Sequence, residues 1–210
     1  MSPLAVEIWS DVVCPWCYVG KRRFEKALEG FAHRDDVEVT WRSFELDPQA
    51  PPQREHTSAE HLASKYGLSL EQAEGTNAQM TELAADEGLE YHLDRTKGGN
   101  SFAAHRLIQR AVEDGRQDAM KERLMRAYFT DGEAIGDHNT LVRLAGEVGV
   151  DGQAALTDER YADGVRADEE LAARIGIRGV PYFVLDRRYG VSGAQPPELL
   201  LQALEKAVEP

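Results

Sequence analysis

The chain has 210 residues, enough for one large domain or for one domain that carries a sizeable insertion. Its 24 basic and 37 acidic residues give a net charge of −13, which argues against partners such as nucleic acids and anionic membranes, since both require a basic face. No apolar run approaches the ~20 residues of a membrane span, and the N-terminus lacks the basic region of a secretory signal. We therefore expect a cytoplasmic protein.

The first part of the chain is predicted to form a β–α–β unit. Residues 4–10 (LAVEIWS) are apolar and favour a buried strand. A helix is expected from Cys14 or Pro15 to about residue 31, because proline suits a first helical turn and apolar residues follow at helical spacing. Residues 37–44 alternate apolar with polar side chains, as in a half-buried strand.

The middle of the chain is rich in charged residues, alanine and leucine, and is predicted to be helical. Ser69 and Gln72 form a capping-box pattern at one helix start. Residues 89–94 (LEYHLD) are expected to form a short extended piece or a loop. The predicted helices are 58–66, 69–87, 101–114, 117–130, 138–148 and 158–175.

Strand patterns return near the C-terminus. Residues 182–185 and 189–192 flank Asp-Arg-Arg, which predicts a tight hairpin, and an amphipathic helix closes the chain from the prolines at 196 and 197. The order β–α–β, helices, β–β–α predicts an α/β fold with an inserted all-helical domain. The expected bounds are 1–56 with 176–210 for the α/β domain and 57–175 for the insertion.

Cys14 and Cys17 are the only cysteines, and they stand between the first strand and its helix. Zinc is disfavoured, since there is no second cysteine pair and the pair His56/His61 is at the edge of the usual spacing, so we expect no metal site. A structural disulfide would close too small a loop to stabilise the fold much. Inert buried thiols and zinc remain alternatives to the favoured interpretation, redox chemistry.

The favoured interpretation rests on the helix N-terminus, where free N–H groups and the helix dipole stabilise a thiolate. Cys14 would then be the nucleophile, and Cys17, one turn later, would resolve the mixed disulfide. A Cys-x-x-Cys beside a β–α–β pattern is typical of thioredoxin-like proteins.

Three sequence blocks resemble the DsbA-type branch of the thioredoxin superfamily, and most closely its FrnE-like cytosolic members. They are VEIWSDVVCPWCYVG (6–20), GGNSFAAHRLI (98–108) and GIRGVPYFVLDRRYGVSGAQPPELL (176–200). The resemblance implies a thioredoxin-like domain split by a helical domain. It also implies that Pro181 forms a cis peptide against the dithiol and that the backbone of Val180 pairs with substrate, beside Pro15 and Trp16.

The resemblance suggests further roles. Glu7, on the first strand, is a candidate proton relay to Cys17. His105 and Arg106 are candidates for binding a glutathione carboxylate or a substrate acid. The alternative is that Asn100 and Ser101 cap a helix and that His105 is partly buried and hydrogen-bonded. Trp16 stands where the best-known oxidising members have histidine. Because indole carries no positive charge, we expect a less stabilised thiolate and a less oxidising disulfide.

The leading functional hypothesis is therefore a thiol–disulfide oxidoreductase, with isomerase activity, that uses a redox-active Cys14–Cys17 disulfide and no bound cofactor. Its expected partners are polypeptide or small thiol and disulfide substrates, with glutathione as a candidate co-substrate and, from the FrnE-like resemblance, a link to polyketide biosynthesis. The first alternative is a glutathione-dependent transferase or isomerase acting on a small aromatic substrate, like kappa-class transferases and hydroxychromene-carboxylate isomerases. These usually carry serine at the position of Cys14. The second alternative is a non-enzymatic chaperone or redox sensor.

Overall fold

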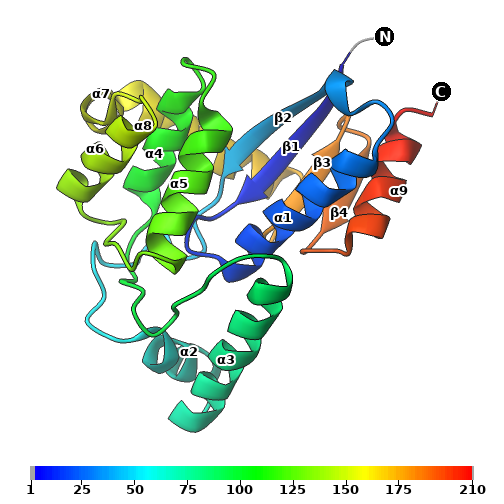
Figure 1. The fold of residues 1–210 in the computed structure, drawn as a ribbon. Coiled ribbons are helices and arrows are strands. Elements are labelled where there is room, and N and C mark those ends of the chain that lie inside the picture. The colour runs from blue at the N-terminus through cyan, green and yellow to red at the C-terminus, as the bar shows by residue number, and fades with distance from the viewer. Residues whose placement is uncertain (1–2, 210) are drawn as a thin grey trace. The chain divides into compact units, whose positions relative to one another are not determined.

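The computed structural model describes residues 3–209, which form two compact units (Figure 1). The sheet unit combines the N-terminal part up to Leu46 with the part from Val165 onwards, and the helical unit comprises Asp47–Gly164. The domain bounds expected from the sequence stay a prediction, because compactness alone does not show that a unit folds independently.

The sheet unit contains a four-stranded sheet in the order β2-β1-β3-β4. β1 runs parallel to β2, whereas β3 pairs antiparallel with both β1 and β4. The strands are β1 (Leu4–Ser10), β2 (Val37–Ser43), β3 (Tyr182–Leu185) and β4 (Tyr189–Ser192), and the helices of this unit include α1 (Pro15–Gly30) and α9 (Pro197–Ala207), with a 3-10 turn at Arg34–Asp36.

The two faces of the sheet are covered by different helices. α1 packs on the face that carries Phe183, because the rings of Phe24 and Phe183 have centroids 5.5 Å apart. The opposite face carries Trp9, whose indole Nε1 donates to the main-chain oxygen of Asp168, 3.0 Å away on α8 (Glu159–Arg174). Successive residues of a strand point to opposite faces, so residues 7 and 9 face α8 and residue 8 faces α1.

The β3–β4 hairpin has a three-residue connection, residues 186–188, in which Asp186 and Arg187 have φ values of 50° and 54°. The amide of Arg188 donates to the carbonyl of Leu185 at 3.0 Å and closes the turn. The tight hairpin expected from the sequence is therefore present.

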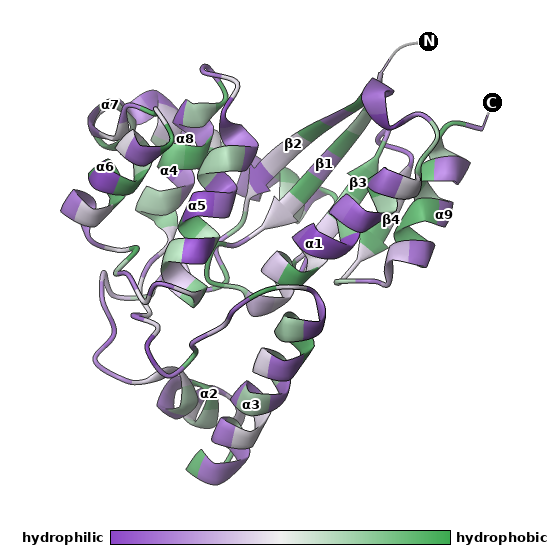
Figure 2. Ribbon diagram, viewed as in Figure 1, coloured by the Kyte–Doolittle hydropathy of each residue, from purple (hydrophilic) through white to green (hydrophobic). Residues whose placement is uncertain are grey.

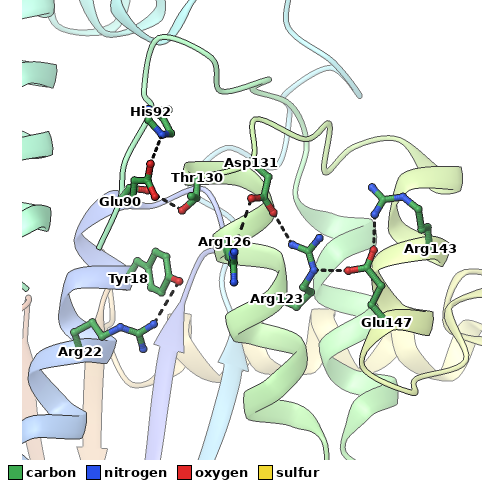
Figure 3. Close-up of polar contacts among 10 residues, drawn as sticks. All are labelled: Tyr18, Arg22, Glu90, His92, Arg123, Arg126, Thr130, Asp131, Arg143 and Glu147. Atoms are coloured by element: carbon green, nitrogen blue, oxygen red, sulfur yellow. Dashed lines mark hydrogen bonds and ion pairs between the residues drawn. The ribbon is translucent and has the colours of Figure 1, made fainter. Parts of the chain in front are cut away.

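The helical unit is held together by leucines and methionines, such as Leu107, Leu124 and Met125, that are fully buried between amphipathic helices (Figure 2). On its surface, Arg123 joins Asp131 and Glu147 at 2.9 and 2.6 Å (Figure 3). The helices are α2 (Ser58–Tyr66), α3 (Leu70–Asp86), α4 (Phe102–Ala111), α5 (Gln117–Phe129), α6 (His138–Glu147) and α7 (Gly152–Thr157), followed by the start of α8.

Most predicted elements of the helical unit agree with the structure. The capping box at Ser69 is confirmed, because its side chain accepts from the amide of Gln72 and the Gln72 side chain accepts from the amide of Ser69. Residues 89–94 form a loop rather than a strand. The prediction missed α7, a short helix that is capped by the side chain of Asp151.

Candidate active site

The dithiol lies at the N-terminal end of α1. Cys14 is the N-cap residue with an extended backbone, and Pro15 occupies the first helical position, where its missing N–H costs no hydrogen bond. The amide of Cys17 donates to the carbonyl of Cys14 at 3.0 Å, which closes the first turn. The sequence therefore places the Cys14 sulfur where the helix presents free amides and the positive end of its dipole.

The loop before β3 brings Val180 and Pro181 to the dithiol. The Cys14 Sγ lies 3.7 Å from the main-chain oxygen of Val180, and the Val180–Pro181 peptide is cis, as expected. Gly20 allows this approach, because a Cβ at this position would lie 2.8 Å from the Cγ of Pro181. The amide of Gly193 also donates to the carbonyl of Pro181 at 2.8 Å, which ties the loop to β4.

Both cysteines are buried, and both are free rather than joined in a disulfide. Cys14 keeps 4 % exposure and Cys17 keeps 1 %. Between them, Trp16 is 45 % exposed and presents a large apolar surface next to Cys14. The exposed indole therefore marks the protein surface beside the dithiol.

A role of Glu7 as proton relay to Cys17 stays a prediction, and its surroundings in the structure do not favour it. Glu7 is buried, but it lies on the sheet face that packs against α8, whereas the helix of the dithiol packs on the opposite face. Its carboxylate is held by Arg42, with Nε 3.0 Å away, and by Arg187 at 3.3 Å. Strand periodicity at Trp9 and Glu7 contained this information, but the sequence alone could not show which face α1 covers.

Two buried charged residues near the dithiol escaped the sequence analysis. Asp11, three residues before Cys14, is fully buried and accepts from the amide of Leu46 at 2.8 Å. Lys21, one helical turn after Cys17, is only 2 % exposed, pairs with Glu25 and lies 5.8 Å from the ring centroid of Trp41. A lysine at spacing i+4 from the second cysteine, on the apolar face of α1, was the signal that could have identified it.

His105 and Arg106 belong to α4 of the helical unit. His105 is fully buried. Arg106 donates from Nε to the carbonyl of Ala155 at 3.0 Å and from Nη2 to that of Asp158 at 3.2 Å, and so satisfies carbonyls at the end of α7. These contacts give Arg106 a structural task, and a role of either residue in glutathione binding stays a prediction.

Neither a metal-binding cluster nor a membrane-spanning helix is present in residues 3–209. This part of the chain contains no group of three or more histidine, cysteine, aspartate or glutamate side chains arranged to hold a metal ion. None of its helices combines the length and the apolar character that crossing a membrane requires.

The mixed sheet, the dithiol at a helix N-terminus and the cis-proline beside it define a thioredoxin-like protein of the oxidoreductase class. Residues 5–205 match the family described as DSBA-like thioredoxin domain, and the chain belongs to this family.

Known relatives agree with this assignment. The chain is 31 % identical over 195 residues to the uncharacterized protein YwbO of Bacillus subtilis (strain 168), a match that covers 86 % of each chain. It is 49 % identical to a probable DsbA oxidoreductase of Streptomyces coelicolor, with a TM-score of 0.92, covering 97 % of this chain and 89 % of that one.

A more distant structure shares the fold alone. The cytosolic disulfide reductase DsbM of Pseudomonas aeruginosa, solved with GSH, has 18 % identity and a TM-score of 0.67 and covers 96 % of this chain and 98 % of that one.

Proposed function

We propose that the protein is a cytoplasmic thiol–disulfide oxidoreductase that works through Cys14 and Cys17. The observation that carries the proposal is the position of the Cys14 sulfur, at the amide-rich end of α1 and 3.7 Å from the Val180 carbonyl. There the Cys14 sulfur stands at the positive end of the helix, and an extended substrate can pair with the backbone of Val180 beside Pro181, Pro15 and Trp16.

The reaction proceeds in two exchanges. The Cys14 thiolate attacks one sulfur of a substrate disulfide, forms a mixed disulfide and releases the other substrate sulfur as a thiolate, which takes up a proton. The Cys17 thiolate then attacks the Cys14 sulfur and releases the second substrate thiolate. The substrate gains two electrons, and Cys14 and Cys17 end as a disulfide. The reverse sequence oxidises a dithiol, and partial passage through it isomerises disulfides.

We propose net reduction as the direction, with glutathione as the co-substrate that restores the dithiol. Trp16 supports this direction, since a neutral indole does not favour the thiolate as a histidinium would. The distant relative DsbM is described as a cytosolic disulfide reductase, in a structure with GSH.

We propose that Lys21 gives electrostatic support to Cys17. Both side chains are buried and stand four residues apart on one face of α1. The ammonium favours the anionic form of the resolving thiol, which must lose its proton before the second exchange. Lys21→Met should slow the resolving step and lengthen the life of the mixed disulfide, and Lys26→Met, on the same helix, should not. Mass spectrometry of quenched reactions with glutathione disulfide measures this lifetime.

Trapping tests the proposed function. Cys17→Ala should accumulate a stable mixed disulfide with glutathione, or with one sulfur of a peptide disulfide that it has attacked, and the modified residue should map to Cys14. Cys14→Ala is the matched control and should trap nothing. The intact protein should catalyse insulin reduction by glutathione. Trapping that needs Cys17 instead, or glutathione conjugation of an aromatic electrophile at full rate by Cys17→Ser, would contradict the proposal.

A further inference from the structure

A second concave surface lies within the sheet unit, on the face of the sheet opposite α1. It has a volume of about 470 Å³, which falls in the range of small-molecule sites. Its floor is formed by Trp9, Tyr182 and Val184 of neighbouring strands, and Leu171 of α8 forms an apolar wall. We name it the α8 pocket.

The floor of the α8 pocket is shaped by an aromatic ring lying close over a glycine. A Cβ at Gly190 would lie 2.4 Å from the phenolic oxygen of Tyr182, so only glycine lets the Tyr182 ring lie along β4 in this way. The result is an apolar, aromatic surface of the kind that binds a planar ring.

The charges around the α8 pocket are opposite to those of the protein as a whole. The pocket is lined by three arginines, Arg174, Arg187 and Arg188, and by one carboxylate, that of Glu7. The chain as a whole has a net charge of −13. Glu7 is already held by Arg42 and Arg187. Within residues 3–209, the guanidinium of Arg174 has no carboxylate partner. The pocket therefore has positive charge in excess at an apolar surface.

One of these arginines, Arg187, lies in the hairpin turn with a backbone conformation that is unfavourable for a residue other than glycine. Arg187 has a φ of 54°, in a turn type whose central positions favour asparagine and glycine. Non-glycine residues held in this region are destabilised and cluster at functional sites. An arginine at a position suited to asparagine or glycine points to a task for its side chain, and its ion pair with Glu7 at 3.3 Å leaves most of its donors available.

We propose that the α8 pocket binds a small organic anion with an aromatic body. Arg174 and Arg187 hold the anionic group, and the ring lies against Tyr182 and Leu171. This site is separate from the dithiol, and the proposal does not rest on the redox function.

The test uses the full reduced chain labelled with nitrogen-15 and two matched probes, 1-naphthoate and its neutral amide 1-naphthamide. Naphthoate should shift the amide resonances of residues 171–175 and 182–190 in a saturable way. It should bind at least about tenfold more tightly than naphthamide, because hydrogen bonds to charged groups are the stronger ones. Added salt should weaken its binding.

Four variants distinguish a loss of charge in the pocket from a loss of folding. Arg187→Gly relaxes the turn, so it should keep or raise stability while weakening naphthoate binding about threefold or more. Arg174→Gln should weaken it similarly, and Arg126→Gln, which alters an exposed arginine of the helical unit, should leave it unchanged. Glu7→Gln removes the one carboxylate of the pocket and should tighten binding.

Several results would overturn the proposal. These are equal affinity for naphthamide, shifts confined to the dithiol region, binding unchanged in both Arg174→Gln and Arg187→Gly, or weaker binding in a folded Glu7→Gln. Shifts of the same resonances on raising the protein concentration without a probe would assign the pocket to a second copy of the chain instead.

Discussion

The sulfur of Cys14 lies 3.7 Å from the main-chain oxygen of Val180, although 166 residues separate the two in the chain. The contact depends on the close packing of α1 against the loop that precedes β3. Gly20 makes that packing possible, because it has no side chain to collide with Pro181. The geometry of the candidate active site therefore depends on a residue that takes no part in the chemistry.

Gly20→Ala should therefore disturb the site. Its Cβ would lie 2.8 Å from Pro181 Cγ and 3.5 Å from the Cβ of Ala194, so the loop before β3 must shift. Overpacking of this kind costs about 1–3 kcal/mol of unfolding free energy. We expect that loss in urea unfolding, together with a several-fold slower disulfide exchange.

The matched control is Gly75→Ala, in the middle of α3. A Cβ at Gly75 has no neighbour within 4 Å, so the substitution should stabilise by about 0.5–1 kcal/mol through helix propensity and leave exchange unchanged. If Gly20→Ala behaved in the same way, the packing of α1 on Pro181 would not govern the site.

Trp16→His should make the Cys14–Cys17 disulfide more oxidising. A histidinium between the cysteines would stabilise the Cys14 thiolate and so the reduced form, which the exposed indole does not do. We expect the reduction potential to rise by about 30 mV or more, a tenfold change in the equilibrium with glutathione. Trp16→Phe is the control and should change the potential little. Equal potentials for the His and Phe variants would refute the electrostatic argument.

Arg42→Met should strongly destabilise the sheet unit. Arg42 Nη1 lies 2.9 Å from Asp168, and its Nε and Nη2 contact Glu7, so it neutralises two buried carboxylates. Burial is the largest influence and lowers the pKa of Arg42, but the contacts with Glu7 and Asp168 together raise the pKa above its ordinary value, and the guanidinium stays charged.

Breaking a buried ion pair from one side costs about 3 kcal/mol or more, and urea unfolding at pH 7 should show this loss. Arg143→Met, which removes a surface arginine paired with Glu133 and Glu147, should cost far less. Comparable losses of unfolding free energy for the two variants would contradict the stabilising role assigned to Arg42.

Glu45→Gln should stabilise the protein near neutral pH. Burial raises the pKa of Glu45 above 4.5, and the neighbouring Glu169 adds to this, while Arg166 partly opposes it. The folded state therefore favours the protonated acid. The stability that protonated Glu45 gives to the parent protein is fully present below about pH 4.5 and is lost as the pH rises through the raised pKa.

A neutral Gln avoids that loss. The unfolding free energy of Glu45→Gln should therefore exceed that of the parent at pH 7, and the difference should shrink toward pH 4. Urea unfolding across this range measures the difference, with the exposed Glu29→Gln as control. A gain that is the same at pH 4 and pH 7 would contradict the assignment to Glu45.

Local sequence was sufficient for most elements and for the identity of the dithiol. The capping box of Ser69, the proline at the start of α1 and the alternation along β1 are interactions within a few residues, so their patterns are visible in one stretch of chain. The short helix α7 was missed because six residues give too little periodicity to detect.

The sequence by itself determined where the cysteines stand, at the start of a helix that follows a buried strand, because capping and periodicity act over a few residues. Only the tertiary structure decided that Glu7 faces α8, that Lys21 is buried on the helix of the dithiol, and that three arginines gather around Tyr182. Those facts depend on which face of the sheet each helix covers, and that choice is made by packing between residues that are remote in the chain.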